Sequence, residues 1–219
     1  MLRLAFVTGT EPGKWLRRFE AGTSHGLEAR GSDDPLAELA EGACDLALVR
    51  LPDARVTEHH HVVVLYEEAP GVAVPKDSVY AEVGESIAVG DLADDIVNLD
   101  FTPGTAIDDL RAALQVVAAN VGVVFAPRPL LKVLSKKQVV ALELIDAPAP
   151  ARPFRIALVW PKELDSEAVQ DFVGVAKGRT MNSSRSSSPR PPVAARRGEK
   201  KVRKRGRGGG AGRGGRGRR

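Results

Sequence analysis

Apolar residues in the first 176 positions form short runs that alternate between strand and helix spacing, with polar turn signals between them. The first apolar run ends at Thr8-Gly9-Thr10, and the segment that follows carries aromatic and aliphatic residues at helical spacing. This order of strand, turn and helix recurs along the chain. It predicts strands at 2–7, 27–30, 45–49, 62–66, 72–75, 96–99, 121–127, 139–144 and 154–161, and helices at 14–19, 36–40, 108–117, 129–134 and 166–175, with 87–92 opening a second series.

The alternation of strands and helices predicts an α/β fold with mixed, mostly parallel sheets. The run 45–49 is continuously apolar, as in a strand that helices cover on both faces. Residues 67–71 separate two extended segments, and three prolines near residue 150 mark a second crossing. We therefore expect two Rossmann-like lobes around a central cleft, as in type 2 periplasmic binding proteins. Lobe I would hold about 1–72 and 152–176, and lobe II about 73–151.

Charge divides the chain into two parts of opposite sign. Residues 1–176 hold 16 Lys and Arg against 27 Asp and Glu, a net charge of −11, whereas residues 177–219 hold 16 Lys and Arg and only Glu199, a net charge of +15. The second part consists largely of Ser, Pro, Arg, Lys and Gly, and it lacks the apolar residues that would offset its ordering entropy. We expect a disordered, basic, Arg/Gly-rich tail at 177–219.

Several functional classes are disfavoured by what the sequence contains. The apolar run at the N-terminus is shorter than the roughly 7 to 15 residues of a signal-peptide core. Nothing approaches the roughly 18 apolar residues of a membrane span. A lone Cys44 makes no internal disulfide and suits a reducing compartment. We expect a cytoplasmic protein that does not bind membranes.

Catalytic and metal-binding signatures are equally weak. There is no evident Ser-His-Asp order, phosphate loop or paired metal-ligand motif, so we expect neither enzymatic activity nor a cofactor. The run His59-His60-His61 would point alternately to opposite faces of a strand and could not converge on one ion, so we expect no metal.

Four collinear stretches carry a resemblance: Leu2–Thr8, Leu36–Val49 with its Gly-x-x-Asp-Leu-Ala pattern, Val117–Pro127, and Phe154–Pro161. In this order they resemble the effector-binding domain of LysR-type transcriptional regulators over residues 1–176, with Asn120 where a glycine is usual. The resemblance implies a small organic acid or similar effector in the cleft and an antiparallel homodimer. Such regulators carry a winged helix-turn-helix before this domain. Here the first strand begins at Leu2, so we expect no helix-turn-helix of its own.

Candidate ligand-binding residues follow predicted strands, where ligands of open α/β sheets bind. Backbone amides at a helix start, with threonine hydroxyls, could hold an anion. The candidates are Thr8, Gly9, Thr10, Ser32, Thr102, Thr105 and Gly122. Ordinary caps and turns are the alternative interpretation.

The tail is a candidate nucleic-acid binder, because flexible cations neutralise phosphates with little regard to sequence. Its candidate residues are Lys200, Lys201, Arg203, Lys204, Arg205, Arg207, Arg213 and Arg216, and the partner would be DNA or RNA. Alternatively, the tail folds back onto the acidic domain.

The leading hypothesis is an effector-binding domain that acts in transcription regulation or signalling. The first alternative is a dimeric scaffold that has lost its ligand and works by binding nucleic acid through the tail. The second is an enzyme on this fold, which would need an acid or base converging on the cleft.

Overall fold

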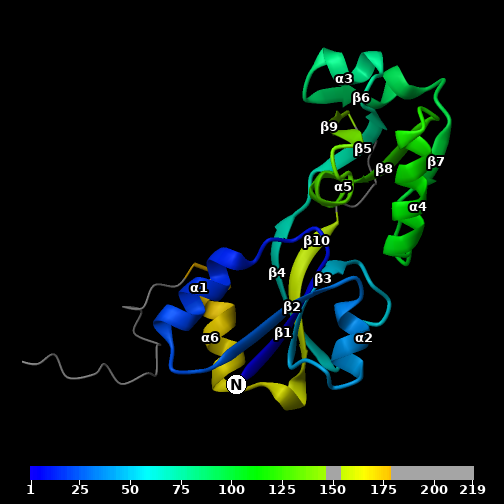
Figure 1. Cartoon of the computed structure of the whole chain (residues 1–219). Helices are drawn as coiled ribbons and strands as arrows, with labels where there is room; N and C mark the ends of the chain where they lie inside the picture. The colour runs from blue at the N-terminus through cyan, green and yellow to red at the C-terminus, as the bar shows by residue number, and fades with distance from the viewer. Residues whose placement is uncertain (147–153, 179–219) are drawn as a thin grey trace, which may run out of the picture. The chain divides into compact units, whose positions relative to one another are not determined.

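The computed structural model describes residues 1–146 and 154–178, which form two five-stranded sheets. Figure 1 shows how their strands and helices are arranged. The first sheet has the strand order β2-β1-β3-β10-β4, and the second has the order β6-β9-β5-β8-β7. The strands of the first sheet are β1 (Leu2–Val7), β2 (Leu27–Ser32), β3 (Leu46–Leu51), β4 (His60–Glu67) and β10 (Arg155–Pro161). Those of the second are β5 (Pro70–Pro75), β6 (Ser86–Ala88), β7 (Val97–Asp100), β8 (Val123–Pro127) and β9 (Val139–Ile145).

Each sheet is mixed, with one strand opposed to the other four. In the first sheet β1, β2 and β3 pair in parallel, and β10 lies antiparallel between β3 and β4. In the second, β5 lies antiparallel between β8 and β9, while β6 and β7 pair in parallel with their neighbours. The prediction of an α/β fold with mixed, mostly parallel sheets is therefore confirmed.

Helices cover both faces of the first sheet. The helices α1 (Gly13–Gly22) and α6 (Glu167–Ala176) lie together on one face (Figure 1), where Phe19 packs against Phe172 with ring centroids 5.4 Å apart. The helix α2 (Pro35–Ala40) places Leu36 and Leu39 on the other face. All six residues of β3 are buried between these layers, as its continuous apolar run predicts.

The second sheet is also covered on both faces. The helices α4 (Ile107–Ala118) and α5 (Arg128–Leu134) bury Leu110, Leu114 and Leu130 against one face. The other face is covered by α3 (Val79–Val83) and the 3-10 helix η1 (Val89–Leu92), and Ile87 of β6 points into the same apolar cluster. A second 3-10 helix, η2 (Lys162–Leu164), follows β10 in the first sheet.

The sequence pattern missed two local features of the second sheet. The helix α3 begins after Ser78, whose hydroxyl accepts a hydrogen bond from the amide of Ala81, and this cap was overlooked. The helix predicted at 108–117 begins one residue earlier, at Ile107, so Asp108 and Asp109 lie in its first turn and do not cap it. Ala106 occupies the N-cap position and makes no side-chain cap. Carboxylates there still favour the helix through its dipole.

The chain passes from the first sheet to the second between Glu67, the end of β4, and Pro70, the start of β5. Gly71 lies so close to α5 that a Cβ atom there would be 2.8 Å from the Cα of Arg128. The return passage and the basic tail lie outside the described residues. Within the described ranges no helix is long and apolar enough to cross a membrane.

Candidate ligand-binding cavity

A cavity of about 630 Å³ lies beyond the carboxyl ends of strands from both sheets. Three segments supply most of the wall: the turn from β2 into α2, the loop after β3, and the turn from β7 into α4. This is where ligands bind in open α/β sheets, and the volume suits a small organic molecule. The lining residues are Val7, Asp33, Asp34, Pro35, Leu36, Val49, Arg50, Pro52, Asp53, Ala54, Arg55, Phe101, Thr102, Pro103, Gly104, Thr105, Ala106, Ile107, Asp108 and Phe154.

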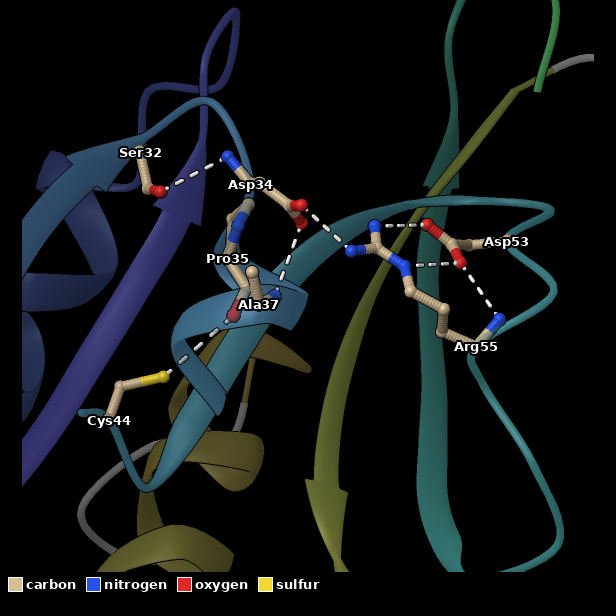
Figure 2. A network of polar contacts seen from close by, with 7 residues as sticks. All are labelled: Ser32, Asp34, Pro35, Ala37, Cys44, Asp53 and Arg55. Atoms are coloured by element: carbon tan, nitrogen blue, oxygen red, sulfur yellow. Dashed lines mark hydrogen bonds and ion pairs between the residues drawn. The ribbon is translucent and has the colours of Figure 1, made fainter. Parts of the chain in front are cut away.

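Arg55 joins two segments of the first sheet's side of the cavity (Figure 2). Its Nε and Nη2 atoms donate to the carboxylate of Asp53 at 3.0 and 2.8 Å, and Nη1 donates to Asp34 at 2.7 Å. Asp34 also accepts from the amide of Ala37, which caps α2. The guanidinium lowers the pKa of both aspartates, so both remain ionised at neutral pH.

Arg111 bridges the two sides of the cavity mouth. Its Nη1 and Nη2 atoms donate to the two carboxylate oxygens of Asp33 at 2.7 and 3.0 Å, and Nη1 also donates to Asp108 at 2.7 Å. The hydroxyl of Thr8 donates to Asp33 at 2.5 Å. The hydrogen bond from Arg111 is the main cause of the lowered pKa of Asp33. One ion pair thus connects α4 with the loop after β2.

A second arginine, Arg50, is buried at the crossing between the sheets. Its Nε and Nη2 atoms donate to the carboxylate of Glu68 at 2.6 and 3.0 Å, and Nη2 also donates to the carbonyl oxygen of Thr8. The two side chains are 6% and 1% exposed. A charged pair removed so fully from water must keep its geometry, because either partner alone would be a buried charge.

The apolar part of the wall includes an aromatic pair. The rings of Phe101 and Phe154 lie 5.4 Å apart at 56°, and Ile107, Val49 and Leu36 add aliphatic surface. Tilted aromatic rings at this distance attract each other.

Two of the predicted ligand-binding residues, Thr102 and Thr105, line the cavity. They also form a tight turn, in which the amide of Thr102 donates to the hydroxyl of Thr105 and the amide of Thr105 donates to the carbonyl oxygen of Thr102. Their hydroxyl oxygens are 3.2 Å apart.

The ligand-binding residues predicted after β1 and β2 are not among those that line the cavity. The amides of Thr8 and Thr10 already donate to the carbonyl oxygens of Ser32 and Val7, and the Thr10 hydroxyl also donates to Val7. The Ser32 hydroxyl accepts from the amide of Asp34. Because α1 begins only at Gly13, these amides do not form the expected helix-start anion site.

At two glycines predicted to bind the ligand, the backbone lies very close to neighbouring residues. Gly9 has φ +95°, and a Cβ atom there would lie 3.0 Å from the Cα of Leu130 and 3.1 Å from Nη2 of Arg50. Gly122 precedes β8, at the end of the second sheet opposite to Phe101, where a Cβ atom would clash with the carbonyl oxygen of Ile96 at 2.1 Å. Gly122 is absent from the cavity wall.

Sequence reasoning missed the charged residues that dominate the site. Asp33, Asp53, Arg55 and Arg111 lie in loops or on a helix surface, where charged residues are common and periodicity carries no signal. Their nearness depends on the fold, since Arg111 and Asp33 are 78 positions apart in the chain.

The remaining candidate chemistry is structural. Cys44 is buried, and burial raises the pKa of its thiol to about 11, so it stays protonated and unreactive at neutral pH. The rings of His61 and Trp160 are tilted by 37° with centroids 5.2 Å apart, and His60 accepts a hydrogen bond from the amide of Thr57. Over residues 1–146 and 154–178 no group of three or more His, Cys, Asp and Glu is arranged to hold a metal ion.

The two mixed sheets, with helices on both faces of each, define an α/β domain of the type 2 periplasmic-binding-protein kind. A family model, the LysR substrate binding domain, matches residues 16–180. The chain therefore belongs to the LysR substrate-binding domain family. No curated protein matches it.

Solved structures share the fold at low sequence identity. The BenM effector binding domain with its effector benzoate is 16% identical, with a TM-score of 0.59, and the match covers 80% of this chain and 90% of that one. Full-length CbnR complexed with its target DNA is 16% identical, with a TM-score of 0.58 and coverage of 80% and 69%. The OxyR C206 mutant of Corynebacterium glutamicum is 17% identical, with a TM-score of 0.54 and coverage of 80% and 63%.

Proposed function

We propose that this chain is a non-enzymatic sensor domain that binds a small organic molecule in the cavity and passes the binding event to a regulatory partner. The observation that carries the proposal is the cavity, because its wall comes from both sheets. A ligand that contacts both sides has a different affinity for each arrangement of the two sheets, and such a difference is what shifts a conformational equilibrium.

The family adds weight to this proposal. Members of the LysR substrate-binding domain family serve transcription regulators, and the similar BenM domain is described with a bound small effector. We place the protein in the cytoplasm on the same ground. The cavity wall also favours binding over catalysis, since its carboxylates are held by guanidinium partners rather than left to act as bases.

Two further features belong to the proposal. We expect the domain to form a homodimer, as the family resemblance implies.

We also expect residues 177–219 to bind DNA or RNA through their net charge of +15. Sequence-tolerant binding of this kind weakens steeply as salt concentration rises, because phosphate-bound counterions are released. A filter-binding series of the full chain with and without Lys200→Ala, Lys201→Ala and Arg203→Ala measures this contribution.

The alternative is a dimeric scaffold with no ligand, whose activity is nucleic-acid binding through the tail. Thermal unfolding of the full chain against a panel of small acids, amines, amino acids and neutral aromatics separates the two. A ligand that binds only the folded state raises Tm in proportion to the logarithm of its concentration. A Tm that rises with the logarithm of the concentration of one compound supports the sensor. No shift from any compound at millimolar concentration would exclude it and leave the scaffold.

A further inference from the structure

Every guanidinium on or beside the cavity wall is already held by carboxylates within the described residues. Arg55 is held by Asp34 and Asp53, Arg50 by Glu68, and Arg111 by Asp33 and Asp108. An incoming carboxylate would therefore have to displace an internal partner before it could pair with any of the three arginines.

The same groups leave the cavity with an excess of negative charge. Five carboxylates face three guanidiniums, a net charge of −2. Hydrogen bonds from the arginines hold the pKa values of Asp33, Asp34 and Asp53 below their usual range, so the excess persists into mildly acidic solution. An anion that enters the cavity is therefore repelled, whereas a cation is attracted.

The aromatic pair supplies a complementary surface. Phe101 and Phe154 form one side of the same cavity. Aromatic faces attract ammonium groups and also cover the apolar body of a small ligand. The wall thus combines carboxylate oxygens and aromatic rings, and in the part of the chain that the structure describes it offers no unpaired guanidinium.

Resting on the proposed effector function, we infer that the cavity selects a small amine with an apolar body, an alkyl- or arylalkylammonium compound, over an organic carboxylate. This departs from the organic acid that the family resemblance suggests. The ammonium group lies toward the carboxylates of the β2–α2 and β7–α4 turns, and the apolar body lies against the two phenylalanines.

Three probes with one apolar body test the inference: 2-phenylethylamine, 2-phenylethanol and 3-phenylpropionate. Isothermal calorimetry on the full chain, in about 0.15 M salt, should show the amine bound at least about tenfold more tightly than the carboxylate, with the alcohol between them. The opposite order would overturn the inference while leaving the sensor proposal intact.

A matched pair of variants locates the effect. Asp108 and Asp109 are both exposed and both lie in the first turn of α4, but only Asp108 lines the cavity and accepts a hydrogen bond from Arg111. Asp108→Asn should weaken the amine about threefold to tenfold and narrow its preference over the carboxylate. Asp109→Asn removes the same charge from the same helix turn and should leave both affinities unchanged. Equal responses would show that the preference does not arise in the cavity.

Failure to bind any of the three probes also overturns the inference for this ligand body. The larger compound panel distinguishes this outcome from failure of the sensor proposal. A hit there from a carboxylate keeps the sensor and rejects the amine, whereas a flat response throughout rejects both.

Discussion

Arg50 and Arg111 each hold a carboxylate through two hydrogen bonds, yet they lie in opposite environments. The pair Arg50–Glu68 is 6% and 1% exposed at the crossing between the sheets, whereas Arg111–Asp33 is 40% and 43% exposed at the cavity mouth. A buried pair is strongly destabilised when one partner is lost, and an exposed pair contributes little to stability. The first therefore maintains the fold at the crossing. The second is weak enough for a ligand to rearrange.

The largest effect should follow from breaking the buried pair. We expect Glu68→Ala to lower the free energy of unfolding by about 3–5 kcal/mol, because the Arg50 guanidinium would remain buried without its counter-charge. Urea unfolding followed by circular dichroism measures the change. The neighbouring Glu67→Ala removes an exposed carboxylate and serves as the control, with an expected change within about 0.5 kcal/mol. Similar losses of unfolding free energy in Glu68→Ala and Glu67→Ala would show that the buried ion pair has no special role in stability.

A smaller loss should follow from crowding the backbone beside the buried pair. Gly9→Ala introduces a Cβ 3.0 Å from the Cα of Leu130 at a residue with φ +95°, and we expect it to cost about 2–3 kcal/mol. Gly104 has nearly the same φ, +92°, but open space around it. Gly104→Ala should therefore cost about 1 kcal/mol, from backbone strain alone. Chemical denaturation of the two variants separates the close contact from the strain, and equal losses would show that the contact is unimportant.

The sequence predicted the fold well because its evidence is local. The apolar runs of β1 and β3 and the helical spacing of α4 reflect burial that neighbouring residues share. Asn120 also stands where the family resemblance leads us to expect glycine. The structure gives it φ +64°, a conformation that asparagine adopts more readily than other side chains. This departure therefore preserves the turn before β8.

The candidate site was harder to predict because its interactions are not local. Thr102 and Thr105, which follow a predicted strand, line the cavity, and their contact with a ligand stays a prediction. The charged network was missed, because Arg111 reads as an ordinary polar position on an exposed helix face. Only the folded arrangement of the two sheets brings it to Asp33.

Removing the exposed pair should have a modest effect on stability. We expect Arg111→Gln to lower the free energy of unfolding by no more than about 1 kcal/mol at neutral pH. A double-mutant cycle with Asp33→Asn isolates the coupling between the two side chains. Because the pair is exposed, this coupling should fall further in 1 M salt, where charges are screened over about 3 Å. A coupling energy above about 2 kcal/mol, or one that does not depend on salt, would show that the Arg111–Asp33 pair behaves like the buried Arg50–Glu68 pair.

The smallest expected effect is the pH dependence of the same exposed pair. Arg111 is the main cause of the lowered pKa of Asp33, so Arg111→Gln should raise that pKa toward the ordinary value of 3.8. A lowered pKa in the folded state contributes stability above the unfolded value and loses it as pH falls through the folded value. The stability difference between wild type and Arg111→Gln should thus be complete at pH 6 and shrink below about pH 4. Carbon-detected NMR titration of the aspartate carboxyls measures the shift, with Asp53 as the internal control because Arg55 sets its pKa. An unchanged Asp33 titration would mean that Arg111 does not hold this carboxylate in solution.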